Sequence, residues 1–121
     1  MTKSRRNLGI WGEKKAAEHL VECGYTLLER NARTAYGEID IVASKDGVTF
    51  FVEVKTSQTQ TFGYPEESIT PLKRDHLVNS AEAYLLDHPE LDGKWQIDVI
   101  AIQHLDPDPP QIIHFKNAIS D

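Results

Sequence analysis

The chain has 121 residues, of which 40% are hydrophobic and 26% charged, and its formal net charge is −6. This composition is typical of a soluble globular domain and excludes disordered, collagen-like and coiled-coil chains. The length predicts one domain, residues 1–121. With one cysteine and no apolar run near the ~20 residues of a membrane helix, we expect a cytoplasmic protein without membrane contact. The acidic total argues against a nucleic-acid partner, because nucleic-acid-binding domains usually carry a net basic charge.

Hydrophobic periodicity and turn residues predict an alternation of helices and strands along the chain. The first helix ends at Gly24, and Asn31 ends the first strand. The second helix begins at Thr70–Pro71, an N-cap followed by proline at the first helical position, and stops before Pro89. This order favours an α/β sandwich. The expected helices cover residues 10–23 and 71–88, and the expected strands cover residues 25–30, 38–43, 48–55, 95–102 and 111–115.

The clearest local signal is a β-hairpin around Asp46–Gly47, a dipeptide typical of two-residue turns. This turn places Asp40 opposite Glu53, and Glu38 opposite Lys55. The strand period of two puts these four side chains on one face. Their expected neighbours on that face are Val42, Ser44, Thr49 and Phe51, and the opposite, apolar face holds Ile39, Ile41, Ala43, Phe50, Val52 and Val54.

Three carboxylates on one face of a hairpin require a physical reason. Directly opposed side chains have Cβ atoms about 4.5–5.5 Å apart, and two like charges at such a distance repel by roughly 3–4 kcal/mol at an effective dielectric near 20. One interpretation is a solvated face on which the side chains splay apart. The other is a divalent cation between Asp40 and Glu53, since magnesium takes one or two carboxylates, waters and phosphate oxygens. Lys55 would then stabilise phosphoryl charge or orient a water.

Other polar residues also have two interpretations. Glu13 is either an acid favoured near a helix N-terminus or a further carboxylate that reaches the hairpin from the inward face of the helix. Phe62 and Tyr64, in the polar segment after the hairpin, would either stack on unpaired bases or fill a local core. Basic side chains near these segments are either solvated or contact phosphates; they are Arg30, Arg33, Lys73 and Arg74.

The motifs, taken in order, resemble one known family. They are Gly12-Glu13-x-x-Ala16, Asn31-x-Arg33, Gly37-Glu38-Ile39-Asp40, Phe51-Val52-Glu53-Val54-Lys55-Thr56, Thr70-Pro71-x-Lys73, Asp98-Val99 and Asn117-Ala118. This pattern, which spans nearly the whole chain, is similar to that of the YraN family. Those small bacterial proteins belong to the PD-(D/E)XK nuclease superfamily and are similar to Holliday-junction resolvases.

The resemblance implies a restriction-endonuclease-like three-layer sandwich with a central mixed sheet and helices on both faces. It implies Mg²⁺ or Mn²⁺ on Asp40, Glu53 and the Val54 carbonyl, with Lys55 and Glu13 also catalytic. Arg33, Lys73 and Arg74 are the expected nucleic-acid contacts. One departure is Ser57, where the family commonly has arginine.

Three hypotheses follow for the function. The first is a metal-dependent endonuclease that cleaves branched, flapped or single-stranded DNA, with a homodimer as its expected assembly. The second is a non-catalytic module on the same fold that binds DNA or a DNA-processing protein. The third is a retaining glycoside hydrolase that uses the Asp40–Glu53 pair; it would be insensitive to EDTA, unlike the first.

Overall fold

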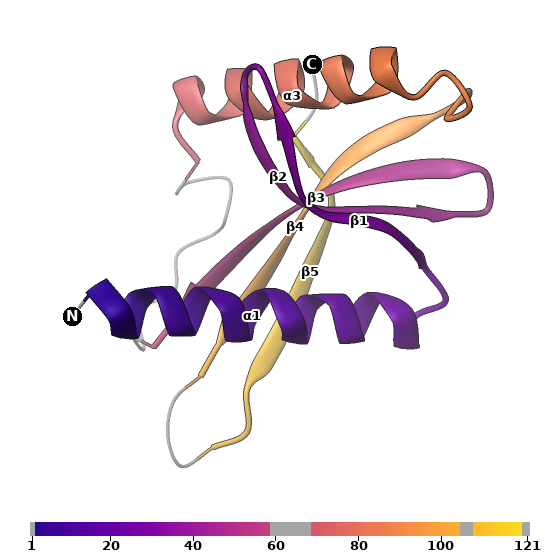
Figure 1. Cartoon of the computed structure of the whole chain (residues 1–121). Helices are drawn as coiled ribbons and strands as arrows, with labels where there is room; N and C mark the ends of the chain where they lie inside the picture. Colours follow the sequence, from indigo (N-terminus) through magenta and orange to yellow (C-terminus); the bar gives the residue numbers. More distant parts are fainter. Residues whose placement is uncertain (1, 59–68, 105–107, 120–121) are drawn as a thin grey trace.

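A computed structural model describes residues 2–58, 69–104 and 108–119 of the chain. Within these residues the chain forms two helices and five strands (Figure 1). Phe62 and Tyr64 lie outside the described residues. In chain order the elements are α1 (Thr2–Glu22), β1 (Thr26–Thr34), β2 (Gly37–Lys45), β3 (Val48–Ser57), α3 (Pro71–Asp87), β4 (Trp95–Gln103) and β5 (Gln111–Ile119).

The five strands form one mixed sheet in the order β1-β2-β3-β4-β5. Neighbouring strands are antiparallel except β3 and β4, which are parallel and are connected through α3. In Figure 1, α1 and α3 lie on opposite sides of the sheet. The expected α/β fold, a restriction-endonuclease-like sandwich, is therefore confirmed. No helix among the described residues is long and apolar enough to span a membrane.

Both faces of the sheet are buried, each under one helix. On β3, Phe50 and Val52 pack with Ala16 and Leu20 of α1. The alternate residue Phe51 packs with the residues of α3, as the strand period of two requires. The described α3 begins where the sequence predicts, since the Thr70 hydroxyl accepts a hydrogen bond from the Lys73 N–H at 3.1 Å.

The predicted hairpin is confirmed near its turn. Asp46 and Gly47 have φ values of 51° and 79°, as a two-residue turn with two left-handed positions needs. The β2–β3 pairs run in the expected register from Lys45–Val48 to Ile41–Val52. The described ladder ends there, so Asp40 and Glu53 lie just beyond the last of these pairs.

Beyond that point the expected division of faces is wrong for Ile39. Ile39 packs in the core under α3 with Val42, and not with Ile41 on the α1 face. Two local features account for this. Asn31, on the neighbouring strand β1, has a φ of 53°, and β2 has left its ladder with β3. The β1–β2 hairpin therefore twists away from the sheet toward α3, as Figure 1 shows.

Three expected element ends are also wrong. Helix α1 begins at Thr2, eight residues before the predicted start at 10. Its first turns include the helix formers Lys3, Arg5 and Arg6 but have no apolar period from which the start could be predicted. Strand β1 continues through Asn31 to Thr34, since asparagine tolerates a left-handed conformation. Strand β5 likewise continues beyond residue 115 to Ile119.

Candidate active site

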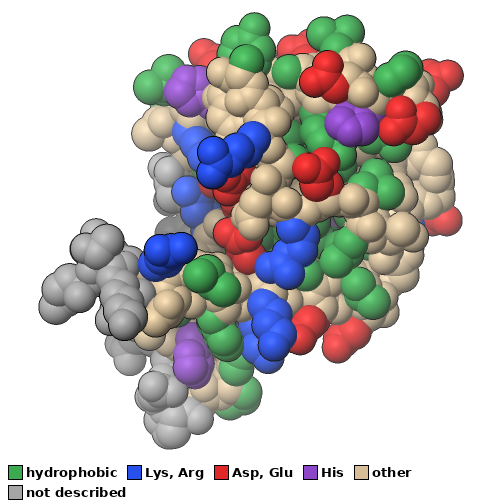
Figure 2. Space-filling model, in the orientation of Figure 1, with side chains coloured by type: hydrophobic (Ala, Val, Ile, Leu, Met, Phe, Trp, Pro, Cys, Tyr) green, Lys and Arg blue, Asp and Glu red, His purple; other side chains and the backbone are tan. Residues whose placement is uncertain are grey.

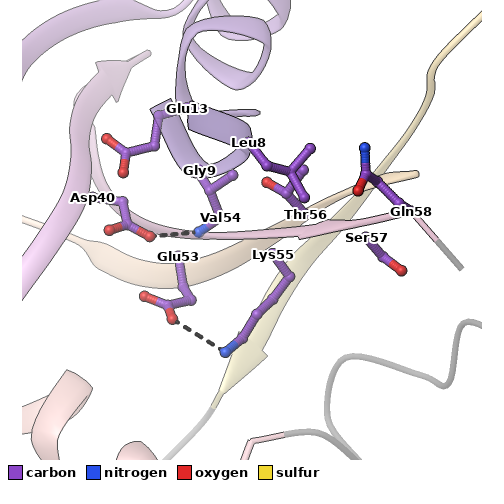
Figure 3. Close-up of a pocket in the computed structure, with 10 residues that line it drawn as sticks. All are labelled: Leu8, Gly9, Glu13, Asp40, Glu53, Val54, Lys55, Thr56, Ser57 and Gln58. Atoms are coloured by element: carbon purple, nitrogen blue, oxygen red, sulfur yellow. Dashed lines mark hydrogen bonds and ion pairs between the residues drawn. The ribbon is translucent and has the colours of Figure 1, made fainter. Parts of the chain in front are cut away.

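Three carboxylates from three different elements line one hollow of about 640 Å³. Glu13 comes from α1, Asp40 from β2 and Glu53 from β3. Figure 3 shows Glu13 and Asp40 pointing toward one another on one side of β3, with Glu53 and Lys55 on the other. The expectation that Asp40 shares one face of the hairpin with Glu53 and Lys55 is therefore wrong, although Asp40 and Glu53 line the same hollow. The hollow thus lies at the notch where β2 separates from β3. The remaining lining residues are Leu8, Gly9, Val54, Thr56, Ser57 and Gln58.

Asp40 occupies the end of the β2–β3 ladder in an unusual way. Its Oδ2 accepts a hydrogen bond from the Val54 backbone N–H at 2.8 Å, so its carboxylate takes the place of a main-chain acceptor. Burial, followed by the negative charge of Glu53, raises the pKa of Asp40 to about 7. The Val54 hydrogen bond opposes this rise, and the charge of Glu13 adds to it.

Glu53 is a buried carboxylate between two lysines. The residue is 5% exposed, and its Oε2 lies 3.6 Å from Lys55 Nζ and 3.4 Å from Lys73 Nζ. The side chain of Lys55 was expected to point to the same side as Glu53, and it does. Lys73 comes from the first turn of α3, so the Lys73–Glu53 ion pair connects α3 to the sheet at the site. A phosphate near Glu53 would meet both ammonium groups.

Glu13 is held by Asn31. The Asn31 side-chain amide donates to Glu13 Oε1 at 2.8 Å and to Glu38 Oε1 at 3.3 Å. Burial raises the pKa of Glu13, and Glu38 and Glu53 raise it further, whereas the positive charge of Arg30 lowers it. The left-handed backbone of Asn31 directs its amide to the α1 side of the sheet, where Glu13 lies.

Gly12 explains how α1 comes close enough for Glu13 to reach the strands. A Cβ atom at Gly12 would overlap the Thr56 side chain of β3. The helix therefore lies directly against β3 at this point, which only glycine permits. Glu13, the next residue, projects into the notch as a result.

Comparison with known proteins places the chain in a family. The sequence profile of the uncharacterised protein family UPF0102 matches residues 12–102. The chain belongs to the UPF0102 family. It is similar to the UPF0102 protein of Syntrophomonas wolfei, with 46% identity over 80% of this chain and 84% of the relative. For the UPF0102 protein of Dehalococcoides mccartyi the identity is 37% over 100% of this chain and 99% of the relative.

These matches confirm the resemblance to the YraN family. A third UPF0102 relative, from Roseiflexus castenholzii, is 48% identical over 84% of this chain and 83% of its own length. The charged and amide side chains of this UPF0102 chain in or beside the notch lie inside the matched range 12–102; they are Glu13, Arg30, Asn31, Asp40, Glu53, Lys55 and Lys73.

Two predicted contacts of the UPF0102 chain do not reach the notch. Arg33 has an 89% exposed side chain and lies 3.8 Å from Glu38 Oε2, within the β1–β2 hairpin. Glu38 was expected opposite Lys55, which is wrong, because the hairpin that carries Glu38 turns away from β3. Arg74 is exposed on α3 and does not line the hollow. Asn31, expected to end a strand, instead positions Glu13; its presence in the Asn31-x-Arg33 motif was the available signal.

The donor set of the notch fits a hard divalent cation. The carboxylates of Asp40 and Glu53, with Val54 beside them, would leave room for waters and phosphate oxygens around the cation, as magnesium prefers. The raised pKa values of Asp40 and Glu13 reflect burial and like charges, which a cation would compensate. Among the described residues, no three acidic, histidine or cysteine side chains form a ready-made metal cluster. Glu53 would have to turn from its lysines to join such a cluster.

Proposed function

We propose that this UPF0102 protein is a metal-dependent endonuclease that hydrolyses phosphodiester bonds in branched, flapped or single-stranded DNA. The observation that supports the proposal is the meeting of Glu13, Asp40 and Glu53 at one notch, with Lys55 and Lys73 at its edge. A homodimer would present two such notches to a branched substrate.

Asp40 and Glu53, with the Val54 carbonyl, would hold Mg²⁺ or Mn²⁺. The metal would polarise the scissile phosphate and lower the pKa of a bound water. In the hydrolysis the water oxygen forms a bond to phosphorus, and the bond from phosphorus to one ester oxygen breaks. The water loses a proton and the departing oxygen gains one. Lys55 would orient the attacking water or accept its proton, while Glu13 would hold a second water.

A second candidate is a non-catalytic module that binds DNA or a DNA-processing protein. One observation favours it: Glu53 is ion-paired with both Lys55 and Lys73, so its charge is already compensated without a metal. Such a module would use the two lysines for binding and would not need Asp40. It predicts salt-sensitive binding without cleavage.

The deciding experiment incubates the purified protein with branched, flapped, single-stranded and duplex DNA in Mg²⁺, in Mn²⁺ and in EDTA. Asp40→Asn and Glu53→Gln remove the charge of each proposed ligand at nearly constant shape. The matched controls are Asp87→Asn and Glu82→Gln, at exposed positions of α3.

We expect metal-dependent cleavage by the wild type and by both control variants, and its loss in both site variants. Cleavage that persists in Asp40→Asn or Glu53→Gln, or in EDTA, would refute the assigned residues. Binding without any cleavage, unaffected by Asp40→Asn, would favour the non-catalytic module.

A further inference from the structure

A second hollow, of about 530 Å³, lies between α1 and β1. Its volume falls within the ~300–1,000 Å³ range of ligand-binding pockets. One wall is the C-terminal half of α1 and the other is β1, so the hollow is a groove along the helix. We call it the α1–β1 groove; its lining residues are Lys14, Ala17, Glu18, Val21, Glu22, Leu27 and Arg30.

The α1–β1 groove meets the active-site notch at the Glu13–Asn31 hydrogen bond. Lys14 follows Glu13 on α1, and Arg30 precedes Asn31 on β1. The charge of Arg30 also acts on Glu13, which shows that the two side chains are near one another. From Leu8 in the notch to Glu22 at the far end of the groove, α1 rises about 20 Å at 1.5 Å per residue. Gly9 and Glu13 of the notch and Ala17 and Val21 of the groove follow one another at four-residue intervals, so the two hollows lie end to end along one stripe of the helix.

The charges in the groove are graded along this path. The cations Lys14 and Arg30 lie at the end next to the notch. Glu18 pairs with Lys15 at 3.6 Å, and Glu22 is at the far end, in the last turn of α1. Figure 2 shows Lys and Arg side chains on this face of the molecule, next to acidic ones. An anionic chain would be attracted at the notch end and repelled at the far end.

The floor of the groove is apolar. Ala17, Val21 and Leu27 contribute to it, and Val21 is 56% exposed. A duplex presents its phosphates outward and covers the faces of its bases by stacking, so its bases cannot contact the apolar floor. An unpaired strand exposes its bases and can place them on apolar side chains while its phosphates meet cations.

We propose that the α1–β1 groove binds an unpaired DNA strand that continues from the phosphodiester in the notch. Lys14 and Arg30 contact its phosphates, and the floor receives its bases. The course of the strand from the notch into the groove rests on the proposed function. The binding of a single strand in the groove does not depend on it. The proposal narrows the substrate class to DNA with a free strand next to the cleavage point.

The test measures binding of a fluorescent single-stranded oligodeoxynucleotide, and of its duplex, by anisotropy in EDTA. The double variant Lys14→Gln/Arg30→Gln removes both groove cations. The matched control Lys94→Gln/Lys116→Gln removes two exposed cations elsewhere and changes the net charge equally. Arg30→Lys keeps the charge in the groove.

We expect the groove double variant to bind the single strand about tenfold more weakly, with the slope of log K against log salt smaller by about 1.4, or 0.7 per lost contact. The control double variant and Arg30→Lys should stay within about twofold of the wild type, and duplex binding should change less than single-strand binding. Equal losses in both double variants, an equal loss for duplex, or no single-strand binding by the wild type would overturn the inference. Because EDTA prevents cleavage, a failure of the nuclease proposal leaves this result interpretable.

Discussion

Replacing Asp40 by asparagine should stabilise the metal-free protein at alkaline pH. The carboxylate is partly buried at the notch, and this burial, followed by the charge of Glu53, raises its pKa to about 7. Asparagine has nearly the same shape, and its amide oxygen can still accept the hydrogen bond from the Val54 N–H. The substitution therefore removes a costly charge and keeps the local contacts.

The magnitude follows from the difference between the folded and ordinary pKa values of this group, about 7 and 3.8. At 1.36 kcal/mol per pH unit, the charged carboxylate costs up to about 4 kcal/mol above pH ~7. Because the folded state binds the proton more tightly, the free energy of unfolding of the wild type falls as the pH rises from about 4 to about 7. The advantage of Asp40→Asn should grow by about 3 kcal/mol between about pH 5 and about pH 8.5.

The assay is urea denaturation of the wild type, Asp40→Asn and the exposed control Asp87→Asn, in EDTA at both pH values. Saturating Mn²⁺ should reverse the order at the higher pH, since a ligand that binds only the folded wild type stabilises it. A stability difference between Asp40→Asn and the wild type that does not change with pH would refute the reasoning. So would a variant that is less stable than the wild type at about pH 8.5.

Two further substitutions test how the notch is built. Asn31→Gly tolerates the left-handed backbone but lacks the side-chain amide that holds Glu13. We expect the affinity for Mn²⁺, measured by calorimetry, to fall about tenfold. An unchanged affinity would contradict the positioning role of Asn31. Gly12→Ala places a methyl group against Thr56 and should lower the free energy of unfolding by about 1–3 kcal/mol. Gly9→Ala, whose Cβ would have no neighbour within 4 Å, is its control and should not destabilise α1; equal stabilities of the two variants would show that the close helix–strand approach is unimportant.

Much of the hairpin could be predicted because its determinants are local. Asp46–Gly47 selects a two-residue turn, and the turn sets the register of every pair that follows it up to Ile41–Val52. This register predicts that Asp40 lies near Glu53 and that Lys55 points to the same side of β3 as Glu53. The prediction failed for the faces of Ile39 and Asp40 (Figure 3) and for the partner of Glu38, because strand alternation assumes that the ladder continues. Here β2 leaves β3 at Asp40, and only the packing of the β1–β2 hairpin toward α3 sets the direction it takes.

The sequence by itself determined the order of elements, the α/β class and the candidate acids, since hydrophobic period, turn residues and motif spacing are properties of neighbours along the chain. The tertiary structure decided which of those residues meet. Lys73 reaches Glu53 across the two layers at 3.4 Å, whereas Arg33 remains on an exposed hairpin. Asn31 holds Glu13 because β1 bends and Gly12 lets α1 approach. Such contacts join residues tens of positions apart, and their geometry depends on packing that no local pattern encodes.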